Sequence, residues 1–386
     1  MALNVNTDIG WFGLITPCGN PTERITSMRQ ELGHDVDFAE VSRRFVRAFA
    51  DEFGFSPRPE PQERRPDWLT VRLQPEESVS PVEDMLSGLH LHTVCQEAMC
   101  PNKGECFARG TSTFIILGDV CTRGCRYCAV GKGKPEAPDA AEPYNVAQAV
   151  QRMKLRHAVI TSVTRDDLPD GGAGHFVAVM KAVRAASPHT SVEVLVPDFQ
   201  GNRDAIDAVC DVRPDVFNHN LEAVRRIFAQ VRPRASYDLS LKVLAHAAER
   251  GLRVKSGIML GLGETWDEIR QTLADLHAHG CRFLTLGQYL APSTAHVPVA
   301  RYLAPDEFDH WKRVALNMGF TGVASAPLVR SSYRAEAMLE EQAAASRLQH
   351  FLAHEASTDA GVGNQGRQGH QGCQGMSCAT TPQGIV

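Results

Sequence analysis

The feature that most constrains the fold is a regular alternation of short apolar runs and amphipathic segments from residue 112 onward. Repeated strand–helix units favour a parallel sheet with crossover helices. The sequence therefore predicts an α/β fold, an incomplete (β/α)6 barrel of the TIM type. The expected strands, each bounded by Gly, Pro, Asp or Asn, are 113–117, 158–162, 192–196, 216–219, 254–260 and 283–286. The expected helices are 144–156, 174–186, 203–211, 221–229, 237–250 and 265–279.

The barrel is expected to carry extensions at both ends. The tail is rich in Gly and Gln and cannot bury enough apolar surface to offset its ordering entropy, so we expect it to be disordered. The expected parts are a partly helical N-terminal extension ending in a Pro-rich linker (1–65), a cysteine-rich segment (66–110), the partial barrel (111–330), a C-terminal helical extension with a serine motif (331–356) and the disordered tail (357–386).

Composition excludes several classes of protein. The net charge is −5, without the basic excess that is typical of nucleic-acid binders. No apolar run approaches the roughly 18 residues that a membrane-spanning helix needs. The N-terminus lacks the basic start and long apolar stretch of a secretory signal. We therefore expect a cytoplasmic protein that binds neither nucleic acid nor membrane.

Six of the 11 cysteines lie between Cys95 and Cys128, and in a reducing compartment such clusters indicate metal binding or catalysis. Cys121-x3-Cys125-x2-Cys128 follows the first expected strand, and active sites of such barrels lie at the carboxyl ends of strands. Three thiolates can bind three irons of a cubic iron–sulfur cluster and leave the fourth iron open. The alternatives are a partial zinc site or buried structural thiols, although zinc ribbons use paired C-x2-C units.

A second triplet, Cys95-x4-Cys100-x5-Cys106, lies in a loop that contains Pro101 and Gly104. It is also one ligand short of a closed four-ligand site, so it needs a partner from elsewhere in the chain. Zinc binding and a cysteine-rich loop with a supporting thiol remain the alternatives.

Four weaker patterns follow apolar runs, and the first three of these runs are predicted strands. A glycine-rich turn at 257–264 either approaches a nucleotide or is only a turn. Residues 218–222 either line the mouth of the barrel or cap a helix. Adjacent acids at 166–167 either serve chemistry or are solvated or capping groups. Two serines at 331–332 are typical of a helix N-cap, and ligation of iron by serine is the sharper hypothesis.

Taken together, these motifs resemble the lipoyl synthases, a family of radical S-adenosylmethionine (SAM) enzymes. Phe107, Ser112 and Thr164 depart from the usual family residues, and none of them removes a candidate ligand. The matching segments are PDWL (66–69), HTVCQEAMCPNKGEC (92–106), CTRGCRYC (121–128), DDLPDGG (166–172), NHNLE (218–222), KSGIMLGLGE (255–264), GQYL (287–290) and RSSY (330–333).

The resemblance implies two [4Fe–4S] clusters with separate roles. One cluster, held by Cys121, Cys125 and Cys128, would bind SAM and cleave it to methionine and a 5′-deoxyadenosyl radical. That radical would abstract hydrogen from a protein-bound octanoyl chain. The auxiliary cluster would donate sulfur at C6 and then C8 and be consumed. Its implied ligands are Cys95, Cys100, Cys106 and Ser332.

The resemblance also implies residues that contact SAM. Tyr127 would help to form the adenine pocket, while Glu264 would contact SAM or instead position the helix that follows it. The other implied SAM-site residues are Asn218, Asn220, Gly257, Met259 and Gly261.

The implied substrate is an octanoylated lipoyl carrier domain, of a 2-oxoacid dehydrogenase acyltransferase or the glycine cleavage H protein. An electron donor such as flavodoxin or ferredoxin and an iron–sulfur carrier for cluster rebuilding are the other implied partners. Such carriers tend to be acidic, so a basic docking face is one hypothesis and ordinary solvated helix faces are the other. The candidate basic residues are Arg152, Lys154, Arg156, Arg225, Arg226, Arg232 and Arg234.

Two competing functions use the same cysteines differently. An enzyme that inserts sulfur as biotin synthase does would keep the 121–128 triplet, but would not call for the 95–106 triplet together with the serine motif. A zinc-binding interaction protein would use both triplets for zinc.

Overall fold

The computed structural model describes residues 4–14, 25–54, 65–72 and 74–340, and the chain divides into two compact units, Met1–Arg64 and Arg65–Val386. The tail expected at 357–386 and most of the 331–356 extension lie outside the described residues, although residues 335–340 are helical. The elements of the first unit are η1 (Ile9–Leu14), α1 (Met28–Leu32) and α2 (Phe38–Phe53).

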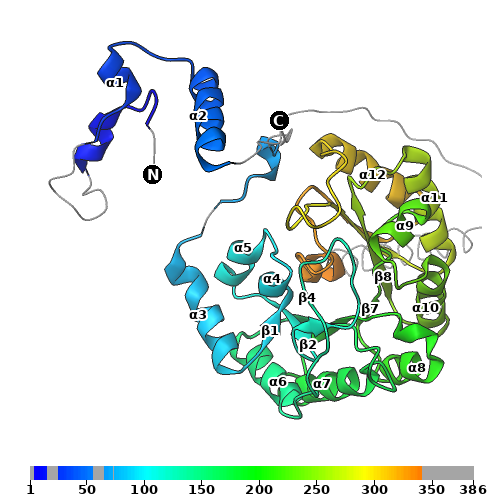
Figure 1. Ribbon diagram of the computed structural model, residues 1–386. Helices are drawn as coiled ribbons and strands as arrows, with labels where there is room; N and C mark the ends of the chain where they lie inside the picture. The colour runs from blue at the N-terminus through cyan, green and yellow to red at the C-terminus, as the bar shows by residue number, and fades with distance from the viewer. Residues whose placement is uncertain (1–3, 15–24, 55–64, 73, 341–386) are drawn as a thin grey trace, which may run out of the picture. The chain divides into compact units, whose positions relative to one another are not determined.

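The second unit is built on an eight-stranded sheet in which seven neighbouring strands are parallel and β1 is antiparallel to β2 (Figure 1). In sheet order the strands are β1 (His92–Thr93), β2 (Thr113–Ile116), β5 (His157–Ser162), β6 (Ser191–Leu195), β7 (Val216–Asn218), β8 (Val254–Leu260), β9 (Phe283–Gln288) and β10 (Gly322–Ser325). A separate parallel pair joins β3 (Val120–Cys121) and β4 (Gly131–Lys132).

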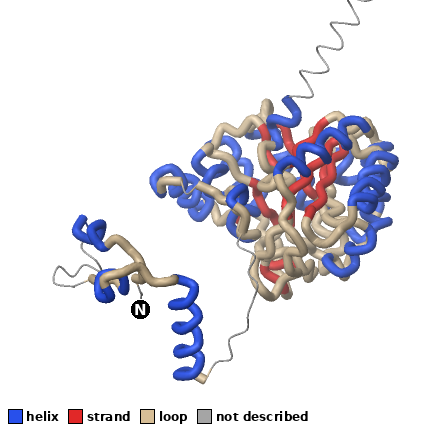
Figure 2. The backbone as a smooth tube through the Cα atoms, turned by 90° about the horizontal axis from the view of Figure 1, so that it is seen from above, coloured by secondary structure: helices blue, strands red, loops and turns tan. Residues whose placement is uncertain are grey.

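Helices α6 to α12 surround the strands (Figure 1), and in the view turned by 90° helices lie on either side of the strands (Figure 2). Among the described residues, no helix is both long and apolar enough to cross a membrane. The helices of this unit are η3 (Asp67–Leu69), α3 (Glu76–Gly88), α4 (Val94–Glu97), α5 (Lys103–Ala108), α6 (Glu142–Arg152), α7 (Ala173–Ala186), η4 (Phe199–Gly201), α8 (Arg203–Asp211), α9 (Arg225–Val231), α10 (Tyr237–Glu249), α11 (Trp266–Ala278) and α12 (Pro305–Asn317).

The predicted α/β architecture is confirmed, and the structure adds two strands to the six expected ones. β1 is only two residues long, and β10 is a four-residue part of an apolar run, so neither has a clear alternating pattern. The helix expected at 221–229 begins later, at Arg225. Glu222 instead forms a bridge with Ile258 and has a φ of 76°, which excludes it from a helix.

Local sequence explains several features of the elements. Every residue of β2 and β9 is buried, as expected for parallel strands that are covered on both faces. Ser236 caps α10 by accepting a hydrogen bond from the backbone of Leu239. Thr265 and Glu268 form a capping box at the start of α11.

A buried ion pair connects the middle strands of the sheet. Lys255 on β8 donates to Glu193 on β6 at 2.9 Å, and both side chains are 1% exposed. Asn218 on β7 donates to the same carboxylate at 2.9 Å, and His157 on β5 lies 3.4 Å from it. Burial alone would raise the pKa of Glu193, but Lys255 and His157 lower it to about 2. The carboxylate is therefore charged at neutral pH.

We predict that Glu193→Gln destabilises the protein by about 3–5 kcal/mol, because it leaves the Lys255 charge buried without a counter-ion. Urea unfolding followed by circular dichroism measures this change. The matched control is Asp267→Asn, which removes an exposed partner of Arg270 and should cost less than about 1 kcal/mol. Equal stability of the two variants would show that the buried pair is not a main support of the sheet.

Candidate functional site

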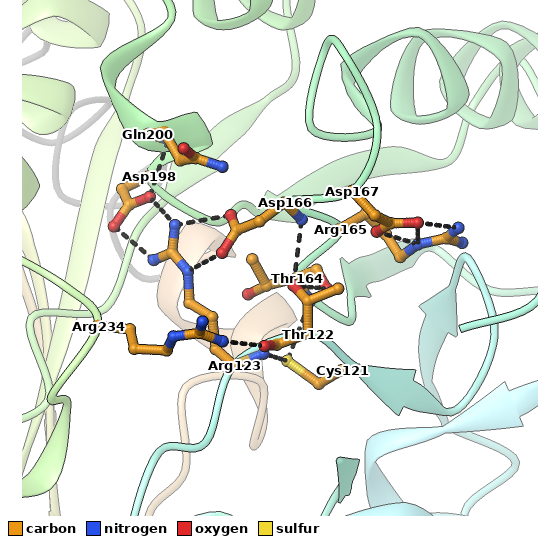
Figure 3. A network of polar contacts seen from close by, with 10 residues as sticks. All are labelled: Cys121, Thr122, Arg123, Thr164, Arg165, Asp166, Asp167, Asp198, Gln200 and Arg234. Atoms are coloured by element: carbon orange, nitrogen blue, oxygen red, sulfur yellow. Dashed lines mark hydrogen bonds and ion pairs between the residues drawn. The ribbon is translucent and has the colours of Figure 1, made fainter. Parts of the chain in front are cut away.

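The first cysteine triplet lies just beyond the carboxyl end of β2. Cys121 ends β3, and Cys125 and Cys128 lie in the loop that returns to β4. The Sγ of Cys121 accepts hydrogen bonds from the backbone N–H groups of Arg123 and Thr164, both at 3.4 Å (Figure 3). The loop is therefore held in a definite conformation around its first cysteine.

The three thiols of this triplet are close enough to influence each other's ionisation. Burial raises the pKa of Cys128 to about 11, and the charges of Cys125 and Cys121 contribute to that rise. Burial also raises the pKa of Cys125. None of the three forms a disulfide. The thiols of Cys125 and Cys128, whose pKa is raised, need a strongly positive group nearby to become thiolates, and an iron–sulfur cluster provides one. The donor set thus fits a cubic cluster with one open iron.

The second triplet lies at the opposite end of the same strand. Cys95 is on α4 and Cys106 is on α5, with Cys100 between these helices. Burial and the charge of Cys100 raise the pKa of Cys95 to about 12 and that of Cys106 to about 11. The pairing of Thr93 on β1 with β2 brings α4 to the amino end of β2. A four-residue strand spans about 13 Å at roughly 3.3 Å per residue. The distance between the two triplets, which lie at opposite ends of β2, is therefore on the order of this length.

Within the described residues, no three Cys, His, Asp or Glu side chains gather as they would around a single metal ion. Cysteines of both triplets instead line one cavity of about 800 Å³. Part of its wall is apolar, including Val159, Val163, Ile258, Leu290 and Val329. The site therefore offers two sets of thiols and an apolar space that reaches both.

Residues 326–334 pass along the cavity side of β9 and β8, and two strand glycines make room for them. A Cβ on Gly287 would lie 2.0 Å from the carbonyl oxygen of Val329. A Cβ on Gly257 would lie 3.0 Å from the Oγ of Ser331. Real Cβ atoms do not come as close as 2.0 Å to a carbonyl oxygen, so any larger residue at position 287 would displace the segment. A Cβ at position 257 would meet the Oγ1 of Thr285 first, at 2.5 Å, and would crowd the hydroxyl of Ser331. In Figure 1 the end of the described chain, in orange, lies within the ring of helices.

The same segment joins the surroundings of the two triplets. Ser331 donates to Asn220 at 2.7 Å, on the side of the 121–128 loop. Tyr333 and Arg334 donate to Glu105 at 3.0 and 2.9 Å, on the helix that carries Cys106. Ser332 lies between these two anchors and lines the cavity.

The structure separates the predicted SAM-site residues into two groups. Asn218 lies away from the cavity, since its side chain donates to Glu193. Glu264 accepts backbone N–H bonds from Gly261 and Leu262 at 2.6 and 2.9 Å, so it holds the turn before α11. The predicted residues that do line the cavity are Tyr127, Asn220, Gly257 and Met259.

Gly261 is required by the backbone. Its φ is +99°, and a Cβ there would lie 2.2 Å from the Nε2 of Gln288. Both observations account for a glycine at this position without a ligand.

Four charged residues lie near the triplets, and none of them is among the cluster ligands or SAM-contacting residues that the sequence predicts, although Glu222 belongs to the motif 218–222 that is a candidate for the mouth of the barrel. Arg232, one of the candidates for a basic docking face or a solvated helix face, has neither role: it is 8% exposed, lines the cavity and donates to the carbonyl of Asn220 at 2.8 Å. Glu222 and Arg330 also line the cavity, and Arg123 lies inside the cysteine loop. A single charged residue has no periodic pattern, so hydrophobic periodicity and cysteine spacing do not assign a role to these four residues.

Most of the other basic residues proposed for docking are already engaged within the chain, so they do not form one free basic face. Arg234 donates to the backbone of Thr122 in the cysteine loop. The remaining partners are Gln148 for Arg152, Glu336 and Glu340 for Arg156, Asp238 for Arg225 and Glu268 for Arg226.

Comparison with known proteins agrees with this geometry. The family model described as "Radical SAM superfamily" matches residues 115–276. The lipoyl synthase of Chlorobium chlorochromatii (strain CaD3) is 51% identical over 279 residues, covering 72% of this chain and 95% of the relative. The lipoyl synthase of Rubrobacter xylanophilus is 53% identical over 279 residues, covering 72% and 87%. That of Methylococcus capsulatus is 53% identical over 276 residues, covering 71% and 86%. The chain therefore belongs to the lipoyl synthase family of the radical SAM superfamily.

Proposed function

We propose that this lipoyl synthase inserts sulfur at C6 and C8 of an octanoyl-lysine, with an auxiliary [4Fe–4S] cluster as the sulfur source. Family membership implies one [4Fe–4S] cluster, SAM and a lipoyl carrier protein as substrate. The observation that carries the finer proposal is the cavity that reaches both cysteine triplets and Ser332.

In this proposal the 121–128 triplet and the residues around it form the SAM site. The thiolates of Cys121, Cys125 and Cys128 would hold a cluster, which would supply the electron needed to cleave SAM. Tyr127 and Met259 line the adjoining wall and provide an aromatic ring and a flexible thioether to pack against SAM. Asn220 is held in place by its bond from Ser331 and presents its amide to the same cavity.

The 95–106 triplet would hold the auxiliary cluster, with the Oγ of Ser332 as fourth ligand. Serine oxygen is a harder ligand than a thiolate and should be the more readily released partner when the cluster opens. The bonds of Tyr333 and Arg334 to Glu105 support this assignment, because they anchor the residues next to Ser332 on the helix of Cys106.

The apolar part of the cavity would bind the octanoyl chain between the two triplets. Each buried methylene contributes about 0.8 kcal/mol, so the apolar wall can hold an unfunctionalised chain without polar groups on it. A dry site also protects a carbon radical from side reactions. Each insertion replaces one C–H bond by a C–S bond, so two equivalents of SAM are consumed per product.

We further propose carriers of the 2-oxoacid dehydrogenase acyltransferase or glycine cleavage H protein type. Flavodoxin or ferredoxin would donate electrons, and an iron–sulfur carrier would rebuild the auxiliary cluster. A cytoplasmic site of action would keep the thiols of both triplets reduced, as cluster binding requires.

The first test is an anaerobic single turnover with SAM, a reductant and an octanoyl-lysine peptide. We expect a dithiolated peptide together with two equivalents of 5′-deoxyadenosine, from protein that contains about eight irons per chain for two cubic clusters. Mass spectrometry and iron analysis measure these quantities. Formation of 5′-deoxyadenosine without sulfur in the peptide would contradict the auxiliary-cluster proposal, and stoichiometric zinc in place of iron would contradict both clusters.

The second test concerns the serine ligand. We predict that Ser332→Ala changes the electron paramagnetic resonance (EPR) spectrum of the auxiliary cluster and lowers sulfur insertion at least tenfold, while the SAM cluster still forms. Ser331→Ala is the matched control, because its hydroxyl is bonded to Asn220 and it should leave the auxiliary spectrum unchanged. An unaltered spectrum in Ser332→Ala would assign the hydroxyl a capping role instead.

The third test concerns the space for the serine segment. Gly287→Ala places a methyl group against the carbonyl of Val329, so we predict a displaced segment and a selective loss of sulfur insertion. Cleavage of SAM to 5′-deoxyadenosine should be reduced much less. Gly88→Ala is the control, since nothing lies within 4 Å of its added Cβ. Equal sulfur insertion by the two variants would show that the segment can be accommodated elsewhere.

A further inference from the structure

A buried arginine lies inside the first cysteine loop, between Cys121 and Cys125 (Figure 3). The side chain of Arg123 is 5% exposed and makes four hydrogen bonds to two carboxylates. Its Nε and Nη2 donate to Asp166 at 2.7 and 2.9 Å, and its Nη1 and Nη2 donate to Asp198 at 2.7 Å each. Such double forks have a geometry that lysine cannot reproduce.

The two carboxylates lie beyond the carboxyl ends of two different strands. Asp166 follows β5, and Asp198 follows β6, where it also accepts a hydrogen bond from the backbone of Gln200 at 3.0 Å. Asp198 is 1% exposed. Arg123 therefore ties the cysteine loop to the carboxyl ends of two neighbouring strands.

Neutral hydrogen bonds hold the same stretch of backbone. Thr122 donates to the carbonyl of Thr164 through its N–H at 3.0 Å and through its Oγ1 at 2.9 Å. The backbone N–H of Asp166 donates to the Oγ1 of Thr122 at 3.1 Å. These bonds fix residues 122–123 and 164 relative to each other, which aims the N–H groups of Arg123 and Thr164 at the Sγ of Cys121.

Hydrogen bonds to the sulfurs of an iron–sulfur cluster help to set its reduction potential, and partners beyond the ligands hold those ligands in place. An N–H donor stabilises the negative charge that reduction adds, so it raises the potential. Resting on the proposed function of the 121–128 triplet, we propose that Arg123 is a positioning residue of the SAM cluster. Through Asp166 and Asp198 it holds two N–H donors on Cys121 and so sets the potential and the retention of the cluster.

The neighbouring pair Arg165–Asp167 provides the comparison. Arg165 is buried to a similar degree, at 2% exposure, and also forks a carboxylate, that of Asp167. Its remaining bond goes to the carbonyl of Leu117 at 3.2 Å, and Figure 3 shows its guanidinium directed away from the cysteine loop. We therefore expect loss of this fork to disturb a buried arginine while the two N–H donors stay on Cys121.

The experiment uses the anaerobically reconstituted full chain and measures iron content and the midpoint potential of the SAM cluster by EPR-monitored redox titration. The SAM cluster is identified as the signal that changes when SAM is added. Arg123→Lys keeps the positive charge and loses the double fork, so we expect a more negative potential and loss of iron on gel filtration. Arg165→Lys should retain the potential and iron content of the unaltered chain.

Thr122→Val is the second variant, because it loosens the same backbone without a change of charge and keeps Arg123. Thr122→Val should shift the potential in the same direction by a smaller amount. If Arg123→Lys does not fold, the potential of Thr122→Val tests the inference instead. Unchanged potential and iron in Arg123→Lys, or an equal shift in Arg165→Lys, would overturn the inference. Absence of a four-iron cluster from the unaltered chain would instead overturn the proposed function.

Discussion

The arrangement of the site depends on the hydrogen bonds between β1 and β2. This short antiparallel pairing brings the helices of Cys95 and Cys106 to the amino end of β2, while Cys121 follows the carboxyl end of the same strand. A strand is a stiff spacer with a fixed rise per residue, so it separates the two triplets by a set distance. An apolar cavity between them can then be reached from both ends.

Residues 329–334 of the chain form part of the wall of the site. Parallel strands usually fill the space inside such a sheet with large side chains, but Gly257 and Gly287 leave room on β8 and β9. The segment that follows β10 occupies this room and connects Asn220 with Glu105 through consecutive residues. One short segment therefore makes hydrogen bonds to the surroundings of both triplets.

Several features could be predicted from the sequence because they are local. The six strand positions follow from buried runs bounded by turn residues, and the two triplets follow from cysteine spacing. The caps at Ser236 and Thr265 are equally local, since each side chain accepts a hydrogen bond from a backbone N–H three residues ahead. The structural contacts of Asn218, Gly261 and Glu264 could not be predicted from the motifs. Each of these residues has a partner in the fold that a motif does not reveal.

By itself the sequence determined the α/β class and the two sets of thiols, because periodicity and spacing are properties of neighbouring residues, and the resemblance of its motifs to known sequences indicated the family. Only the tertiary structure showed that Arg232 lines the cavity and that Arg123 donates hydrogen bonds to Asp166 and Asp198. It also decided that Ser332 lies on a segment passing beside strand glycines. The physical reason is that these contacts join residues tens to hundreds of positions apart, and only the folded chain brings such residues together.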